Sequence, residues 1–138
     1  VHYGFIEKFI EQLGEKYNIR EIAFDRWGAV QMTQNLENLG FTVVPFGQGF
    51  KDMSSPTKEL MKLTLEQKLA HGSHPVLRWM MDNIYIRTDP AGNIKADKEK
   101  STEKIDGAVA TIMALDRAIR CGNVTSESVY DTRGLLVF

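Results

Sequence analysis

Residues 22–28 decide the fold class, and they read Ile22-Ala23-Phe24-Asp25-Arg26-Trp27-Gly28. The apolar run before the acid is too short for a helix, which predicts a strand over residues 19–24 that is buried on both faces. Asp25 then stands at the carboxyl end of this strand, where open parallel sheets have their functional crevice. The alternative role of Asp25 is a helix N-cap that accepts the backbone N–H groups of residues 27 and 28.

Helices and strands alternate along the chain, which predicts an α/β fold. Apolar residues at helical spacing predict helices over 2–17, with Gly14 and Asn18 as stop signals, and over 28–39. A strand over 41–46 follows, and the strand–helix–strand run implies parallel neighbours joined by a right-handed crossover. We expect a loop over 47–55, in which Ser55 caps a helix over 56–70 with Pro56 in its first turn. The later predicted elements are helices over 76–83 and 102–120, strands over 84–87 and 94–95, and a hairpin turn over 89–93.

The composition excludes several classes of protein. The 138 residues fit one domain, and the formal net charge of -1 means that contact with a polyanion must come from a local patch. No run of about 18 apolar residues and no signal peptide occurs, so we expect no membrane contact. The single cysteine, Cys121, cannot form an internal disulfide, which fits a cytoplasmic location. The chain begins without Met, and we expect it to be part of something longer.

A second acid, Asp106, opens the last predicted helix. It lies three and seven residues before Val109 and Met113, which predicts that it faces inward. The alternative is an acid that complements the positive end of the helix dipole. Two carboxylates brought together repel unless a cation lies between them, and oxygen-rich sites suit Mg²⁺ or Mn²⁺. Such ions activate water for cleavage of phosphodiesters, although this chemistry requires at least one acid besides Asp25 and Asp106.

Several motifs occur in the order found in one protein family. They are AFDRWGA at 23–29, GQGF at 47–50, MSSP at 53–56, HPVLRW at 74–79 followed by Asn83, Lys98, KIDG at 104–107 and YDTRGLL at 130–136. This ordered set resembles the nuclease domain of the large terminase subunit of tailed bacteriophages. The resemblance implies a ribonuclease H-like fold and a Mg²⁺- or Mn²⁺-dependent endonuclease that cuts concatemeric viral DNA during packaging in the host cytoplasm. By position, Asp25 matches the family's second acid and Asp106 its last, so both are the expected catalytic metal ligands.

The resemblance also implies parts that this sequence does not contain. In the family the first acid comes from a three-strand meander that precedes the opening helix, so we expect an incomplete fold without its first three strands. We also find no Gly-x-x-x-x-Gly-Lys-[Ser/Thr] motif, so the chain is not the ATPase motor. We expect a partial nuclease domain over 1–123, whose activity requires the upstream strands, and a C-terminal tail over 124–138.

The partners implied by the resemblance belong to the packaging machinery. They are double-stranded DNA, the terminase ATPase domain, the small terminase subunit and the portal protein. A sheet without its first strands would expose an edge, which predicts pairing with another chain. A partner chain, a swapped dimer of this chain or a larger parent protein would each cover this edge.

Further candidates lie near the two acids or between the helices. Arg26, Lys98 and Lys104 are candidates for contacts with DNA phosphates, the alternative being a solvated charged loop. His71 and His74 lack a third nitrogen or sulfur ligand nearby, so we expect them to cap a helix end, with His74 also lining the cleft. Asn83 is either a turn former or an amide that positions a ligand. Trp27 is expected to pack the strand end, and Trp79, Met80 and Met81 are expected in the core.

Two other functions compete with a nuclease. A truncated, catalytically inactive relative would bind DNA or dock on the packaging machinery. Another ribonuclease H-like enzyme, such as a resolvase or transposase, would prefer branched or end-specific DNA. Cleavage of plasmid DNA with Mn²⁺ by this chain and by a form extended upstream distinguishes the nuclease from the inactive relative.

Overall fold

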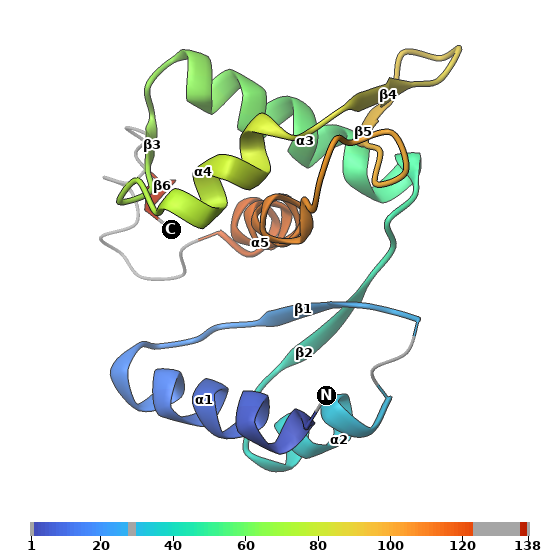
Figure 1. The fold of residues 1–138 in the computed structure, drawn as a ribbon. Helices are drawn as coiled ribbons and strands as arrows, with labels where there is room; N and C mark the ends of the chain where they lie inside the picture. The colour runs from blue at the N-terminus through green and yellow to red at the C-terminus, as the bar shows by residue number, and fades with distance from the viewer. Residues whose placement is uncertain (1, 28–29, 123–135, 138) are drawn as a thin grey trace. The chain divides into compact units, whose positions relative to one another are not determined.

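The computed structural model describes residues 2–27, 30–122 and 136–137, in which five helices and six strands are found (Figure 1). The chain divides into two units, residues 1–47 and 48–138, and each is described by itself. In the described part of the chain, no helix is both long and apolar enough to cross a membrane.

The first unit contains the predicted strand–helix–strand run. Its elements are α1 (Tyr3–Lys16), β1 (Ile22–Asp25), α2 (Val30–Asn38) and β2 (Val43–Phe46). The two strands are parallel, as predicted, with Ile22 opposite Val43 and Asp25 opposite Phe46. Both helices lie on the same side of these strands (Figure 1). The predicted start of α2 at Gly28 lies outside the described residues, and Gly40, at a φ of 95°, follows the helix as predicted.

Gly14 does not end α1, contrary to the prediction. It lies inside the helix, and a Cβ at this position would come within 2.8 Å of the Phe41 ring. The glycine therefore allows α1 to lie close to the segment before β2. The helix ends at Lys16, because Tyr17 takes an extended conformation. The Asn35 side-chain amide donates to Glu7 Oε1 at 2.9 Å, and this hydrogen bond joins α2 to α1.

The strand β1 is less buried than its apolar sequence predicts. All four of its residues are half-buried, and the buried apolar side chains among the described residues of this unit are Leu36 and Phe46. Within the described part of this unit, the two-stranded sheet has both helices on one side. Trp27 is 82% exposed, so the prediction that it packs the strand end is wrong.

The second unit is built on two long helices. Its helices are α3 (Phe50–Leu65), α4 (Pro75–Asp82) and α5 (Asp106–Cys121), and its strands are β3 (Leu69–Ala70), β4 (Ile86–Thr88), β5 (Ile94–Ala96) and β6 (Leu136–Val137). The strands β4 and β5 form the predicted antiparallel hairpin. The helix α5 packs against α3 and α4. The buried apolar side chains of the described second unit are Met53, Pro56, Leu60, Leu63, Ile105, Ala108, Val109, Ile112, Met113 and Leu115.

The limits predicted for α3 are wrong at both ends. The helix begins at Phe50, behind Gly49, so Ser55 is no cap and Pro56 lies inside the helix. Burial of Met53, which is 2% exposed, favours a helical turn that the glycines and serines of this segment do not suggest. The helix ends at Leu65 because Gln67 takes a φ of 56° and the Lys68 N–H returns to the Leu63 carbonyl at 2.9 Å. The following residues therefore form β3 rather than the last turn of a helix.

The last helix begins four residues later than predicted, at Asp106. The preceding segment is a turn organised by Asp97, which is 7% exposed. Its Oδ1 accepts the N–H groups of Glu99 at 2.9 Å and Lys100 at 3.1 Å, and its carbonyl accepts the Ser101 hydroxyl at 2.6 Å. These bonds satisfy backbone groups in a turn, so the charged segment has an alternative to a helix.

The predicted C-terminal tail lies mostly outside the described residues. Its described part, β6, pairs in parallel with β3, with Leu69 opposite Leu136 and Ala70 opposite Val137. The end of the chain thus contributes a strand to the second unit.

Candidate metal and DNA site

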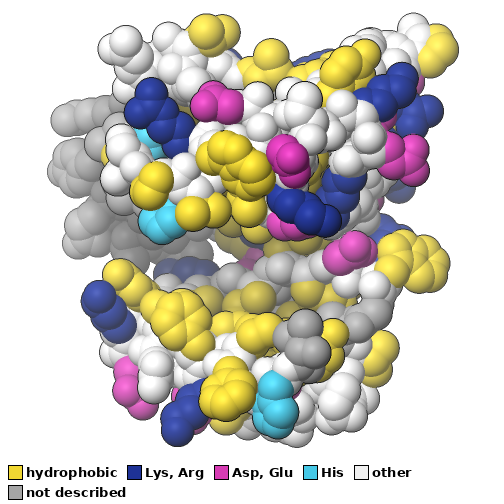
Figure 2. Space-filling view, in the orientation of Figure 1, with side chains coloured by type: hydrophobic (Ala, Val, Ile, Leu, Met, Phe, Trp, Pro, Cys, Tyr) yellow, Lys and Arg dark blue, Asp and Glu magenta, His cyan; other side chains and the backbone are white. Residues whose placement is uncertain are grey.

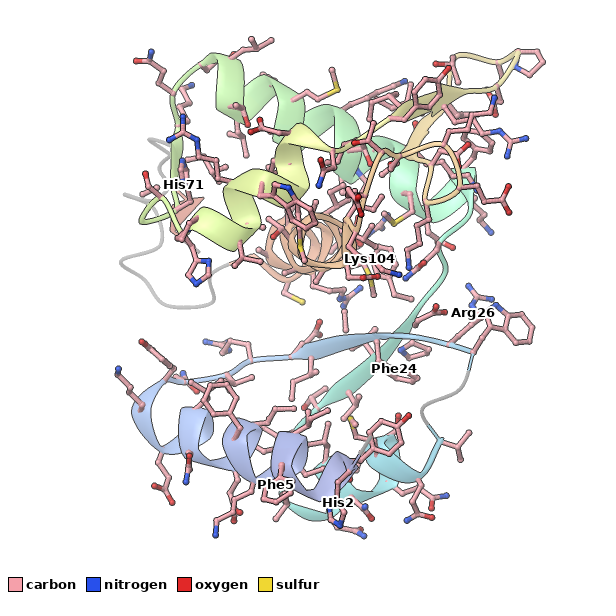
Figure 3. All side chains as sticks on the ribbon, in the orientation of Figure 1. His2, Phe5, Phe24, Arg26, His71 and Lys104 are labelled. Carbon is pink, nitrogen blue, oxygen red and sulfur yellow. The ribbon has the colours of Figure 1, made fainter. Side chains whose placement is uncertain are left out.

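Asp25 ends β1, as predicted from its position after the apolar run. The residue is half-buried, and its Oδ1 accepts the Trp27 N–H at 3.3 Å. This bond is one of the two that the N-cap alternative predicts, and the donor at residue 28 lies outside the described residues. Arg26 is exposed and extends from the same strand end (Figure 3). An acid and a cation therefore lie together at the carboxyl end of the strand.

Asp106 does not face the core, and the predicted inward orientation is wrong. Its side chain is 69% exposed. The inward positions of this turn belong to Ile105, which is 2% exposed, and to Ala108 and Val109. Since Asp106 stands one position after Ile105, it falls outside the apolar stripe. It lies in the first turn of α5, where an acid complements the helix dipole, and its carboxylate is open to an ion or a phosphate-bound ligand.

Lys98 lies beside Asp106. Its Nζ is 3.7 Å from Asp106 Oδ1, and the two side chains are 46% and 69% exposed. An exposed ion pair of this kind contributes little to stability. Its consequence for the site is that a positive charge lies next to the Asp106 carboxylate. Lys104 is also exposed, in the segment that leads into α5 (Figure 3).

His74 caps a helix end, as predicted, whereas His71 accepts a backbone N–H in the loop before α4 and caps no helix. His74 Nδ1 accepts the Val76 N–H at 3.2 Å at the start of α4, and His71 Nδ1 accepts the Ser73 N–H at 3.1 Å. His71 also lines an apolar hollow of about 530 Å³ between α3, α4 and α5, which His74 does not line. The role of His74 in a DNA cleft stays a prediction.

Asn83 joins the end of α4 to the segment before α5. Its Oδ1 accepts the Thr102 hydroxyl at 3.2 Å, and its carbonyl accepts the Thr102 N–H at 3.3 Å. Its Nδ2 is buried without a hydrogen-bond partner among the described residues. The structure therefore shows Asn83 as a turn former, and a ligand-positioning role stays a prediction.

The sequence analysis did not predict the contacts that Asp97 makes around Lys98 or that Met80 makes with Gly107. Asp97 holds the turn that carries Lys98, and the hydrogen bond from the Lys100 N–H, followed by that from Glu99, keeps the pKa of this carboxyl below its usual range. Met80 Sδ accepts the Gly107 N–H at 3.1 Å, and a Cβ at Gly107 would lie 2.8 Å from this sulfur. The glycine directly after Asp106 was the sequence signal for such a close contact.

The aromatic and sulfur residues of α4 are less buried than predicted. Trp79 is 45% exposed, and Met80 and Met81 are half-buried, so the prediction that Trp79 lies in the core is wrong. The helix is short, and none of its residues is fully buried.

The chemistry of the two acids fits part of a divalent-metal site. Carboxylate oxygens are the ligands that Mg²⁺ and Mn²⁺ prefer. No group of three or more His, Cys, Asp or Glu side chains suited to a metal occurs among the residues that the structure describes. Asp25 belongs to the first unit and Asp106 to the second, and their convergence on one ion stays a prediction.

Comparisons with known proteins agree with one another. The family described as "Terminase large subunit, endonuclease domain" matches residues 1–121. The large terminase subunit of Enterobacteria phage HK97 is 38% identical over 129 residues, which are 92% of this chain and 25% of that protein. Protein YmfN of Escherichia coli (strain K12) is 31% identical over 121 residues, which are 86% of this chain and 27% of that protein.

A solved structure shows the same relationship. The crystal structure of the HK97 bacteriophage large terminase aligns with a TM-score of 0.78 and 38% identity, over 86% of this chain and 25% of that one. The chain thus spans about a quarter of the length of these relatives. It belongs to the family of terminase large subunit endonuclease domains.

Proposed function

We propose that the chain is part of a metal-dependent endonuclease, with a ribonuclease H-like fold, that cuts concatemeric viral DNA during packaging. Family membership supports this proposal, and the observation that carries it is the exposed Asp106 carboxylate with Lys98 beside it at the start of α5. An exposed carboxylate can bind a metal ion, and the neighbouring lysine can contact a phosphate that approaches this ion.

The residues have separate roles in this proposal. Asp25 and Asp106 each supply a carboxylate ligand, and a further acid from elsewhere in the parent protein completes the site. When bound, Mg²⁺ or Mn²⁺ supplies an activated water and stabilises the leaving oxygen. Lys98 contacts the phosphate that reaches Asp106, while Arg26 and Lys104 bind neighbouring phosphates and position the DNA without reading its sequence.

The proposed partners follow from the family. They are double-stranded DNA, the ATPase domain, the small terminase subunit and the portal protein, all in the host cytoplasm. We further propose that the edge of β1 pairs with a strand from the parent protein or from a second copy of the chain.

Plasmid cleavage with Mn²⁺ tests the proposal. The comparison uses this chain and a form extended upstream by about a hundred residues, enough for a typical domain. We expect cleavage by the longer form, and loss of cleavage in Asp25→Asn and in Asp106→Asn beyond the roughly 10–100-fold that removal of an outer-shell partner costs.

Asp82→Asn serves as the matched control. Asp82 is an exposed acid at the end of α4, and its replacement should leave cleavage unchanged. Equal activity of Asp106→Asn and Asp82→Asn would contradict the assignment of Asp106.

The second candidate function is a non-catalytic module that binds DNA or docks on the packaging machinery. The observation that favours it is the lack of a three-ligand metal cluster among residues 2–27, 30–122 and 136–137. Retained DNA binding without cleavage in either form of the protein would support this function. A preference for branched DNA would instead indicate a resolvase-like enzyme.

A further inference from the structure

Two cations lie opposite each other in the β4–β5 hairpin. Arg87 and Lys95 are register partners of the antiparallel pair, so their side chains share one face of the hairpin. The Arg87 Cζ lies 5.9 Å and the Lys95 Nζ 4.9 Å from the centre of the Phe50 ring, at the start of α3. Lys and Arg side chains are exposed around this end of the second unit (Figure 2).

This pairing is unusual because like charges directly opposite each other destabilise a hairpin. The face of an aromatic ring attracts both cations and offsets part of their repulsion. The ring also restricts where the two side chains lie. The result is a pair of cations concentrated at one place, with part of their conformational entropy already lost before any ligand arrives.

The two cations line a small hollow. Its volume is about 260 Å³, and its polar lining comes from Gln48, Arg87, Lys95, Asp97, Lys98 and Glu99. Of the two acids, Asp97 is buried and uses its Oδ1 to accept the N–H groups of Glu99 and Lys100. The hollow is therefore lined by three cations, Arg87, Lys95 and Lys98, and by two acids. One of these acids, Asp97, already accepts hydrogen bonds within its own turn.

The hollow is connected to the candidate metal ligand. Lys98 lines it, and the same side chain approaches Asp106 Oδ1 to 3.7 Å. The hollow, the β4–β5 hairpin and Asp106 all belong to the second unit. The link that Lys98 makes between the hollow and Asp106 therefore does not depend on the first unit.

We propose that Arg87 and Lys95, held over Phe50, bind a phosphate of the DNA backbone next to the one that reaches Asp106. This inference rests on the proposed function and extends it to residues outside the two acids. The Arg guanidinium suits a phosphate because it donates two parallel hydrogen bonds, and the Lys ammonium adds a point charge. The Gln48 amide lines the same hollow and donates to Met113 Sδ at 3.7 Å, so its second N–H is a further donor for the phosphate.

Fluorescence anisotropy with a labelled DNA duplex tests the proposal directly. Measured in EDTA, where no cleavage occurs, the Arg87→Ala/Lys95→Ala double variant of this chain should bind DNA roughly tenfold more weakly at low salt. Because each lost phosphate contact removes about 0.9 from the slope of log affinity against log salt, and the two residues share one phosphate, the slope should fall by about 0.9.

Three further variants separate charge from geometry. The charge-preserving Arg87→Lys/Lys95→Arg should bind nearly as well as the unmodified chain. Phe50→Leu keeps both charges but loses the ring, so it should weaken binding with little change in the salt slope. Lys62→Ala/Lys68→Ala removes two cations near the other end of α3, twelve residues and about 18 Å from Phe50 in the case of Lys62, and should have no comparable effect.

The outcomes distinguish this inference from the proposed function. Equal binding by the hairpin variant and the Lys62/Lys68 control, or no DNA binding by the unmodified chain, would overturn the inference. Displacement of the duplex by ATP alone, at concentrations where inorganic phosphate has no effect, would indicate a nucleotide site instead. Asp106→Asn affects cleavage and not binding in EDTA, so failure of the nuclease proposal would appear in a different measurement.

Discussion

Asp89 shows at the scale of one residue how the hairpin that carries Arg87 and Lys95 is closed. Its Oδ1 accepts the N–H groups of Ala91 at 3.0 Å and Asn93 at 2.8 Å, and its Oδ2 accepts the Asn93 side-chain amide at 2.9 Å. The Asn93 side chain, followed by these backbone donors, holds the pKa of Asp89 below its ordinary value of 3.8. The carboxylate is therefore the form that the folded turn favours.

The hairpin should accordingly weaken in acid. Because the folded pKa lies below the unfolded value of 3.8, the contribution of Asp89 is complete above pH 3.8 and is lost as the pH falls through the lower folded value. The difference in unfolding free energy between the unmodified chain and Asp89→Asn should shrink over this range. Urea unfolding at several pH values measures it, and a difference independent of pH would contradict the role of the carboxylate. Asp82→Asn, without this network, is the control.

The roles of single residues were only partly predictable from the sequence. Asp25 and Asp106 were placed correctly at a strand end and a helix start, because apolar periodicity fixes those boundaries to within a few residues. Asp97 was missed, since a buried acid inside a charged segment has the same local sequence as a solvated loop. The contact of Arg87 and Lys95 with Phe50 could not be predicted from local sequence. It depends on the register of the hairpin and on a helix that begins 37 residues before Arg87.

At the scale of elements, α5 carries the core of the second unit. Ile112 is 1% exposed in the middle of this helix, while Ile119 on a later turn is 51% exposed. The pair offers the same side chain on the same helix in two environments.

Ile112→Ala should destabilise the protein by about 2–5 kcal/mol, because it removes buried methyl groups and leaves a cavity. Ile119→Ala should cost less than about 1 kcal/mol, since its side chain is already half in water. Chemical denaturation followed by circular dichroism measures both. Similar losses for the two variants would mean that α5 does not pack as described.

The elements that the sequence predicted well are those with uninterrupted periodicity. The helices α1, α2 and α4 and the β4–β5 hairpin occur close to their expected positions. The start of α3 was missed because Phe50 and Met53 gain burial only from the folded unit, and β3 was missed because Gln67 ends the helix in a conformation usually taken by glycine.

At the scale of the whole molecule, the two units differ in how much core they contain. Ten apolar side chains of the described second unit are buried, against Leu36 and Phe46 in the described part of the first. Segments near 40 residues rarely bury enough surface to fold alone.

A protein consisting of residues 48–138 should therefore fold by itself, whereas residues 1–47 should not. Thermal unfolding followed by circular dichroism should show one cooperative transition for the larger piece and none for the smaller. A larger piece without a cooperative transition would show that its core depends on the first unit.

The contact between Met80 and Gly107 leads us to expect that oxidants disturb the start of α5. Peroxide converts a thioether to a sulfoxide, and the added oxygen would need space where the sulfur already touches the first helical turn. Oxidised protein, identified by a mass gain on the peptide with Met80, should lose helicity near Asp106, and Met80→Leu should resist this change. The turn that presents the candidate metal ligand is thus held partly by an atom whose chemistry a cell can alter.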